Sequence, residues 1–195
     1  MNTSNTAIIL AGGKSLRMGF DKKLICLDNR PLIEILIDKL TAIFENIIIV
    51  SNDAALGQKL GVKIVEDEIK DIGPLGGIHA GLKNSNSHYN YFIACDMPYV
   101  NEKYIHFIKN KSSKTNAYAL ITRYKDHIEP FNSFYSKKLT REIENHIKNG
   151  ERSIYSLLRK LEVLYIEEKI ARRYSPDWAM FYNINTIEDL NRILT

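Results

Sequence analysis

The chain of 195 residues has only two cysteines, and its apolar runs are short. Cys26 and Cys95 both lie in apolar contexts, so we expect buried thiols rather than a disulfide framework or a metal cluster. The N-terminal "MNTSNT" lacks the basic region of a signal peptide, and the apolar stretch 7–11 is too short to be a signal or a membrane span. These absences predict a cytoplasmic protein with no membrane partner.

The chain also has little excess of positive over negative charge, because its formal net charge is only +4. Basic residues are spread along the chain apart from a short cluster at 109–114, which is typical of a solvated helix end rather than a nucleic-acid patch. None of the five histidines has ligand spacing to another. The balance favours small anionic substrates over nucleic acid. With no internal repeat, low-complexity tract or linker, we expect a single domain over 1–195.

Short, almost uninterrupted apolar runs alternate with amphipathic helical patterns through the first two thirds of the chain. Runs of that kind predict strands covered on both faces, and the alternation predicts a mainly parallel sheet. We expect strands at 7–11, 46–51, 62–67, 90–96 and 117–123, and helices at 30–44, 75–84 and 101–110. Asn101 is a suitable N-cap for the last of these helices.

The pattern changes after about residue 125. Residues 127–135 have strand-like composition but contain Pro130, which predicts an edge or antiparallel position. Helices around 137–148 and 153–160, a strand at 163–168 and a loop at 169–178 are expected to follow. The predicted fold class is α/β, a three-layer αβα arrangement with a mostly parallel sheet and an antiparallel edge element in the C-terminal half.

The stretch "LAGGKSLRMGFDK" at residues 10–22 combines glycines with clustered cations at the carboxyl end of the first predicted strand. Open α/β sheets bind ligands at this edge, and glycines allow backbone N–H groups to approach phosphate oxygens closely. The stretch matches neither a Walker A loop nor the dinucleotide fingerprint. A structural turn needs the glycines but not Arg17 and Lys22, so the pattern favours a loop that wraps a small, strongly anionic group.

This stretch resembles the signature L-A-G-G-x-S-x-R-M-G-x-D-K of the molybdenum cofactor guanylyltransferases. Four further segments are similar to blocks of that family and follow in the same order over nearly the whole chain. They are "DIGPLGGIHAGL" (71–82), "CDMP" (95–98), "EPFNSFY" (129–135) and "FYNINTIEDL" (181–190). The resemblance implies a Rossmann-like nucleotidyltransferase fold with a nucleotide-binding half at about 1–100 and an acceptor-binding half at about 101–195.

The resemblance also implies a reaction, in which the terminal phosphate of molybdopterin attacks the α-phosphorus of GTP and pyrophosphate leaves. The substrates implied are GTP and molybdopterin, or its molybdenum form, and the implied cofactor is Mg²⁺. Transient contact with molybdoenzymes and cofactor-assembly proteins is implied as well. In such a transfer the protein chiefly positions the groups and stabilises charge.

Three residues are implied to be catalytic. Lys22 would contact the α-phosphate or the transition state, and Arg17 would bind the β- and γ-phosphates, since its planar fork can hold phosphate oxygens in pairs. Asp96 ends a strand at the ligand-binding edge, where a carboxylate suits Mg²⁺. The alternative for Asp96 is a helix cap for the segment near Pro98. Lys14 occupies a position that the family leaves open.

The implied nucleotide pocket combines backbone atoms with polar side chains. Leu10, Ala11 and Gly12 would contact the base and ribose through their backbones. The remaining members of the pocket are Gly13, Lys22, Asn52, Asp67, Gly73, Pro74, Leu75 and Asp96. A carboxylate at Asp67 could accept hydrogen bonds from guanine N1–H and N2–H, and the alternative is a solvated loop charge.

On the acceptor side the resemblance points to Asn183, Asn185 and Glu129. The two asparagines either face the cofactor or lock a loop through hydrogen bonds. The chain departs from the family with polar Asn132 and Ser133, where apolar residues are usual, and with Ile187 in place of a proline. Several aromatic residues could line the pterin half or pack in the core. They are Tyr118, Tyr124, Phe131, Phe134 and Tyr135.

Three other functions remain open at this point. A cytidylyltransferase for the same pterin shares the phosphate loop, although "LAGG" and "GPLGG" resemble the guanylyl branch more closely. A sugar-phosphate or isoprenoid nucleotidyltransferase would commonly be longer or carry an added arm. A silent nucleotide-binding regulator would have lost the metal carboxylate or the cations, whereas Asp96, Lys22 and Arg17 are all present.

Overall fold

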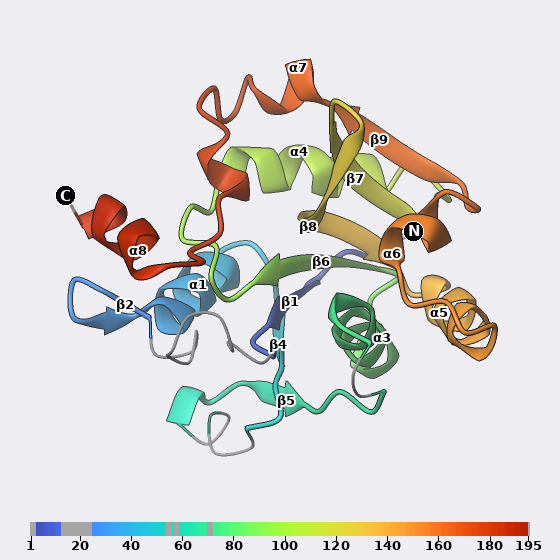
Figure 1. Ribbon diagram of the computed structural model, residues 1–195, viewed down its shortest axis with the longest axis horizontal. Helices are drawn as coiled ribbons and strands as arrows, with labels where there is room; N and C mark the ends of the chain where they lie inside the picture. Colours follow the sequence, from blue (N-terminus) through green and yellow to red (C-terminus); the bar gives the residue numbers. More distant parts are fainter. Residues whose placement is uncertain (1–2, 13–24, 54–55, 57–58, 70–71, 195) are drawn as a thin grey trace.

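The computed structural model describes residues 3–12, 25–53, 56, 59–69 and 72–194. Gly13, Arg17 and Lys22 therefore lie outside the described residues. A seven-stranded sheet in the order β5–β4–β1–β6–β8–β7–β9 forms the centre of the molecule (Figure 1). Its strands are β1 (Thr6–Leu10), β4 (Asn46–Val50), β5 (Lys63–Val65), β6 (Tyr89–Ala94), β7 (Ala119–Tyr124), β8 (His127–Ser136) and β9 (Val163–Glu167). A separate hairpin pairs β2 (Cys26–Leu27) with β3 (Arg30–Pro31).

Five helices lie close to predicted positions: α1 (Leu32–Thr41), α3 (Pro74–Asn84), α4 (Glu102–Ser112), α5 (Leu139–Lys148) and α6 (Ile154–Leu158). The described residues also form α7 (Glu168–Ala171), the 3₁₀ turn η2 (Ala179–Phe181) and α8 (Ile187–Leu194), which the sequence patterns did not predict. Asn101 caps α4 as expected, because its side chain accepts a hydrogen bond from the Tyr104 N–H at 2.9 Å. The segment predicted as loop begins with the short helix α7.

Alternate side chains of the central strands enter two separate cores. Ala7, Ile9, Ile47 and Ile49 belong to the core that α1 and α4 cover, whereas Ile8, Leu10, Ile48 and Val50 pack toward α3 and α5. Figure 1 shows these helix pairs on opposite faces of the sheet. A strand that is buried on both faces has no solvent side, which explains why its sequence is apolar throughout. The predicted three-layer αβα class is confirmed.

The antiparallel strand β8 differs from the prediction in one respect. It is antiparallel to β6 and β7, as expected, but it lies between them and not at an edge, and the edge strand of this half is β9, parallel to β7. Pro130 is tolerated there because β6 pairs only with Ser133–Ser136, and because the β7–β8 register shifts between Leu120 and Thr122. The proline therefore interrupts no continuous ladder.

The two cysteines have different environments. Cys95 is buried, as predicted, but Cys26 is exposed, so the prediction of a buried thiol was wrong at that position. Its apolar neighbourhood belongs to the small β2–β3 hairpin rather than to a strand of the main sheet. Among the described residues, no helix has both the length and the apolar character that crossing a bilayer requires.

Six of the seven strands of the sheet run in the same direction, so their carboxyl ends meet at one edge. Backbone hydrogen bonds continue the pairing just beyond the strand ends: Ala11 N–H donates to Val50 C=O at 2.9 Å, and Cys95 N–H donates to Leu10 C=O at 3.0 Å. The segments that follow β1, β4 and β6 are thereby held side by side, at the edge where open α/β sheets bind ligands.

Candidate active site

Those predicted nucleotide-binding residues that the structure describes gather at this edge. Leu10 ends β1 and Ala11 and Gly12 follow it, while Asn52 and Asp67 each lie two residues beyond the ends of β4 and β5. Ser51 N–H donates to Val65 C=O at 2.9 Å, which keeps the exits of β4 and β5 together. Gly12 and Asn52 are exposed. The fold thus brings residues from three strand exits to one surface.

The turn into α3 completes this surface. Gly73 precedes the helix with a φ of 62°, a conformation that favours glycine, and Pro74 takes the first helical position, where its missing N–H costs no intrahelical hydrogen bond. Leu75 is buried and anchors the turn. The predicted turn chemistry of residues 73–75 is confirmed, and it aims the amino end of α3 at the same sheet edge.

Asp67 packs against α3 and is not a fully solvated loop charge. Its side chain is half-buried, and its Oδ1 accepts a hydrogen bond from Ile69 N–H at 3.0 Å. A Cβ on Gly76 would lie 2.5 Å from Asp67 Oδ2 and 2.7 Å from the Ile69 carbonyl oxygen. The carboxylate therefore reaches the first turn of α3 only because residue 76 lacks a side chain, and the amino end of a helix is a favourable place for an anion.

Asp96 lies just beyond the end of β6 and is buried, with 6% of its surface exposed. The alternative of a helix cap does not hold, because the following helix is capped by Asn101. Its neighbour Cys95 is hydrogen-bonded to Leu10 C=O, so Asp96 stands beside the exit of β1. Asp96 thus lies at the edge where the glycine-rich stretch begins.

A backbone hydrogen bond joins Asp96 to the C-terminal motif. Ile184 N–H donates to Asp96 C=O at 2.9 Å, which places the segment 183–185 directly against the exit of β6. This segment forms neither helix nor strand. Two motifs that lie almost ninety residues apart in the sequence are therefore neighbours at the site.

A capping arrangement at the start of α8 determines the course of this segment. Asp189 Oδ2 accepts from the N–H groups of Asn185 and Thr186, both at 2.9 Å, and Asp189 N–H donates to Thr186 Oγ1 at 3.0 Å. A hydrogen bond from the Tyr182 hydroxyl, together with these N–H groups, lowers the pKa of Asp189. Ile187 occupies the first helical position, where the proline of the family pattern would fit equally well.

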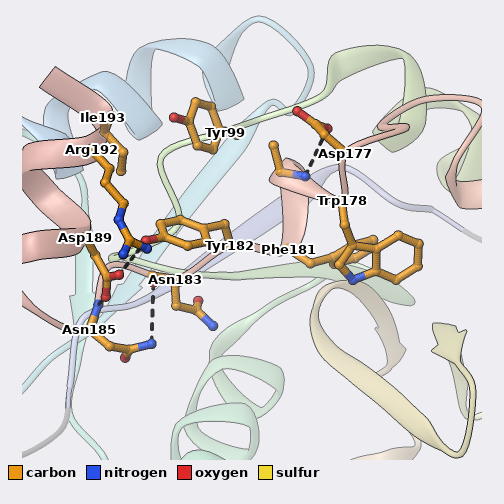
Figure 2. A pocket seen from close by; sticks show the side chains of 11 residues that line it. Tyr99, Asp177, Trp178, Phe181, Tyr182, Asn183, Asn185, Asp189, Arg192 and Ile193 are labelled. Atoms are coloured by element: carbon orange, nitrogen blue, oxygen red, sulfur yellow. Dashed lines mark hydrogen bonds between the residues drawn. The ribbon is translucent and has the colours of Figure 1, made fainter. Parts of the chain in front are cut away.

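An open pocket of about 550 Å³ lies beside this segment. Figure 2 shows Trp178 and Phe181 at one end of it and Asp189 and Arg192 at the other, with Asn183 between them. Its lining residues are Tyr99, Asp177, Trp178, Ala179, Phe181, Tyr182, Asn183, Asn185, Asp189, Arg192 and Ile193. Aromatic walls with a few polar groups are typical of a site for a flat, partly polar ligand.

The two predicted asparagines both line this pocket. Asn185 also stabilises the loop, since its Nδ2 donates to the Asn183 carbonyl oxygen at 3.4 Å (Figure 2). The side-chain oxygen of Asn183 is buried and has no hydrogen-bond partner within the described part of the chain. A buried acceptor of this kind is costly unless a ligand or water donates to it.

Glu129, the third predicted acceptor residue, does not line the pocket. Its Oε1 accepts a hydrogen bond from Trp178 Nε1 at 3.0 Å, so it stands behind the aromatic wall. Burial raises the pKa of Glu129, and the indole hydrogen bond and nearby His127 oppose this shift. Its connection with the pocket is therefore indirect.

The polar residue Asn132, which departs from the family pattern, has a structural explanation. It is fully buried with a φ of 57°, a conformation that asparagine tolerates better than apolar residues do. Its Oδ1 accepts from the Tyr91 hydroxyl at 2.6 Å, and its Nδ2 donates to the Met180 carbonyl oxygen at 3.0 Å. Asn132 thus ties β6 to the turn η2, which belongs to the pocket wall.

Sequence reasoning missed most of the pocket wall. Of the five aromatic residues considered for the pterin half, Phe134 and Tyr135 are fully buried, and none of the five lines the pocket. The aromatic residues that do line it are Tyr99, Trp178, Phe181 and Tyr182. The available signals were the chain's single tryptophan and the closeness of Tyr99 to Asp96 in sequence.

The raised pKa of Glu129 leads to a prediction about stability. A carboxyl whose pKa is raised by folding contributes stability that is present below its ordinary pKa and is lost as the pH rises through the raised value. Glu129→Gln keeps a neutral side chain at every pH. We expect the free energy of unfolding of Glu129→Gln, relative to the wild type, to increase between about pH 4 and pH 7. Urea denaturation across this range measures it, with Glu162→Gln at the exposed surface as the control, and a constant difference would contradict the prediction.

Comparisons with known proteins identify the family. Residues 7–164 match the family model described as the MobA-like NTP transferase domain. The chain is 47% identical over 187 residues to the molybdenum cofactor guanylyltransferase of Syntrophotalea carbinolica, covering 96% of this chain and 89% of that one. It is 48% identical over 192 residues to a probable molybdenum cofactor guanylyltransferase of Peptoclostridium acidaminophilum, covering 96% and 87%.

A solved structure with a related name has a similar fold. The molybdopterin-guanine dinucleotide biosynthesis protein A of Archaeoglobus fulgidus superimposes with a TM-score of 0.82 at 29% identity, covering 96% of this chain and 95% of that one. The fold, the strand-end residues and these relatives define an enzyme of the nucleotidyltransferase class. Within that class, the chain belongs to the molybdenum cofactor guanylyltransferase family.

Enzymes of this family typically use a divalent cation, so the groups near Asp96 can be compared with what such an ion needs as ligands. Within the described ranges, no group of three or more histidine, cysteine or acidic residues is arranged to hold a metal. Magnesium needs no such group when substrate phosphates provide most of its ligands, because one or two carboxylates are then sufficient. The buried carboxylate of Asp96, at the edge where the sequence predicts phosphate binding, fits that requirement.

Proposed function

We propose that the protein transfers the guanylyl group of GTP to the terminal phosphate of molybdopterin, releasing pyrophosphate. The observation that carries the proposal is the hydrogen bond between Ile184 N–H and Asp96 C=O. This bond supports the proposal because it joins the segment that lines the C-terminal pocket to the strand exit at Asp96, beside the residues proposed to bind the nucleotide. Two substrates bound on either side of this contact would meet at Asp96, as a direct transfer between them requires.

The N-terminal half, about 1–100, would bind GTP. The backbone at Leu10, Ala11 and Gly12 would contact the base and ribose, with Asn52 exposed beside them. Asp67, held against the amino end of α3, would accept hydrogen bonds from the N–H edge of guanine. Cytosine lacks that pair of donors, so an acidic side chain at this place favours GTP over CTP.

The C-terminal half, about 101–195, would bind the acceptor in the pocket beside Asn183. The buried oxygen of Asn183, which has no partner among the described residues, would accept a hydrogen bond from the pterin, and the aromatic wall would cover its ring. Bound in this pocket, the acceptor phosphate would reach the strand exits through the side of the pocket next to Asp96.

We propose Asp96 as the residue that holds Mg²⁺, together with phosphate oxygens of the substrate. When bound, the cation would offset the charge of the triphosphate and polarise the α-phosphate. Arg17 would bind the departing pyrophosphate, and Lys22 would stabilise the charge that develops at the α-phosphate. The burial of Asp96 limits competition from water for its carboxylate.

Pyrophosphate release tests the proposal. The protein is incubated with Mg²⁺ and molybdopterin, or its molybdenum form, and with GTP, CTP, ATP or UTP in turn. We expect turnover with GTP that depends on the pterin. Turnover with CTP but not with GTP would contradict the nucleotide assignment, and turnover with a sugar phosphate in place of the pterin would contradict the acceptor assignment.

Gly76→Ala should weaken GTP binding selectively. The new Cβ would collide with the Asp67 carboxylate and with the backbone oxygen of Ile69, so the turn 67–69 must move. We expect the KM for GTP to rise about tenfold with kcat much less affected, because a contact with the bound base is lost. Steady-state kinetics measure this, and circular dichroism checks the fold.

A double-mutant cycle provides the control for Gly76→Ala. If the effect passes through the Asp67 carboxylate, Gly76→Ala should change the KM for GTP much less in an Asp67→Ala background than in the wild type. Fully additive effects would mean that the alanine acts independently of Asp67, contrary to the account.

A further inference from the structure

Trp178 stands out in the pocket wall because its backbone is strained. Its φ is 67°, in the left-handed region that a bulky residue rarely adopts. Such a conformation persists only where the surrounding contacts determine it, and it is found preferentially at functional sites. Trp178 is also the only tryptophan of the chain and lines the pocket, at the end opposite Asp189 and Arg192 (Figure 2).

The backbone around Trp178 is held on both sides. Asp177 Oδ1 accepts from Ser175 Oγ at 2.9 Å and from Ala179 N–H at 3.1 Å, which forms the turn that carries the tryptophan. Two residues later, the Met180 carbonyl oxygen accepts from Asn132 Nδ2. The strained residue thus lies between two anchored positions.

The indole is held as firmly as the backbone. Its Nε1 donates to Glu129 Oε1 at 3.0 Å, and its ring centroid lies 4.7 Å from that of Phe181 and 5.0 Å from that of Tyr124. The guanidinium carbon of Arg172 lies 5.0 Å from the ring centroid. These contacts stabilise the orientation in which the indole lines the pocket.

From this arrangement we infer that Trp178 contacts the ring system of the acceptor, and that Glu129 is a positioning residue that holds the indole in place. The inference rests on the proposed function, in which this pocket receives the pterin. Aromatic side chains bind flat heterocycles through their π-faces and edges, with little dependence on the substituents. Glu129 does not line the pocket, so its effect on the acceptor passes through Trp178.

Fluorescence of the single tryptophan tests the contact directly. Titration of the full-length enzyme with molybdopterin, or with 6-hydroxymethylpterin as a stable probe, should quench the emission of Trp178 in a saturable manner. GTP alone should leave the emission nearly unchanged. Saturable quenching by GTP with none by the pterin would overturn the inference, since it would assign Trp178 to the nucleotide.

Steady-state kinetics separate positioning from general structural support. We expect Trp178→Ala to raise the KM for molybdopterin about tenfold, the usual effect of removing one stacked ring, with the KM for GTP unchanged. Glu129→Ala should raise the same KM about threefold and increase quenching of Trp178 by acrylamide, because the indole loses its anchor. Glu129→Gln should restore both values, since an amide oxygen also accepts from the indole N–H.

The matched control is Tyr165→Phe in β9, whose ring lies beneath the guanidinium of Arg123 and outside this pocket. An unchanged KM for molybdopterin in Trp178→Ala would overturn the inference. So would failure of Glu129→Gln to restore the value that Glu129→Ala loses. Failure of the proposed function has a different signature, since the wild type would then not turn over molybdopterin with GTP, whatever the state of Trp178.

Discussion

Asp96→Asn is expected to lower kcat/KM for guanylyl transfer by at least about a hundredfold. The substitution removes the negative charge that would hold Mg²⁺ against the triphosphate, but it keeps the size of the side chain. The backbone carbonyl that accepts from Ile184 N–H is untouched, so the pocket beside Asn183 should stay in place. Pyrophosphate release at several Mg²⁺ concentrations measures the effect.

Asp126→Asn in the exposed β7–β8 turn is the matched control for Asp96→Asn, and it should behave as the wild type. Thermal unfolding of both variants distinguishes a loss of chemistry from a loss of structure. Activity of Asp96→Asn within about threefold of the wild type would mean that this carboxylate does not hold the cation, because such a ratio is less than 1 kcal/mol of transition-state stabilisation.

Lys22→Ala is expected to lower kcat/KM for GTP by more than about thirtyfold, which corresponds to about 2 kcal/mol. Lys22 lies outside the described residues, so its place in the sequence carries the expectation. The position closes a glycine-rich stretch that begins at the exit of β1, and charge developing on the α-phosphate requires a cation nearby. Single-turnover measurements with excess enzyme would separate this effect from GTP affinity.

Lys14→Ala is the matched control for Lys22→Ala. The same stretch contains both lysines, but Lys14 occupies a position that the family signature leaves open, so its removal should cost much less. Comparable losses in the two variants would indicate a general attraction of cations for the triphosphate. A loss of tenfold or less in Lys22→Ala would mean that the stretch was misinterpreted.

Local sequence patterns predicted the elements of the sheet because each central strand is buried on both faces. Residues 46–50 are a clear example, since Ile47 and Ile49 pack on one side and Ile48 and Val50 on the other. No residue in such a strand can be polar without a buried partner, and the pattern is visible in one sequence. Asn101 was also predictable as a cap, because capping is an interaction between residues close in sequence.

The position of β8 could not be predicted from its own residues. Pro130 indicates correctly that the ladder is interrupted, but the interruption is made by a register shift against β7, which depends on a partner strand. The polar residue Asn132 is another case. Its role depends on Tyr91 and Met180, which are distant in sequence. Comparison with the family pattern therefore showed that an apolar residue is usual at this position, but it did not explain the asparagine.

The pocket beside Asn183 was only half predictable. Asn183 and Asn185 belong to a motif that resembles a family pattern, and both line the pocket. Trp178 lies in an irregular segment without hydrophobic periodicity, so local reasoning gave only a loop there. Its place in the pocket wall follows from Glu129 and Phe181, and one of these contacts crosses from strand β8.

The relatives narrow the functions that the sequence left open. Both curated relatives described above are named guanylyltransferases, and each is about half identical to this chain over nearly its whole length. The names of these relatives do not favour a cytidylyltransferase or a sugar-phosphate nucleotidyltransferase. A silent regulator is disfavoured by the same two relatives, since both are named as enzymes.

A crystal structure with Mg²⁺ and a GTP analogue that has a methylene group between the α- and β-phosphorus tests the central claim most directly. The account predicts a triphosphate along residues 10–22, the cation on the Asp96 carboxylate and the α-phosphate facing the pocket beside Asn183. Guanine should lie against Asp67 and the start of α3. A structure with Asp96 directed away from the triphosphate, and with Arg17 and Lys22 extended into solvent, would contradict it.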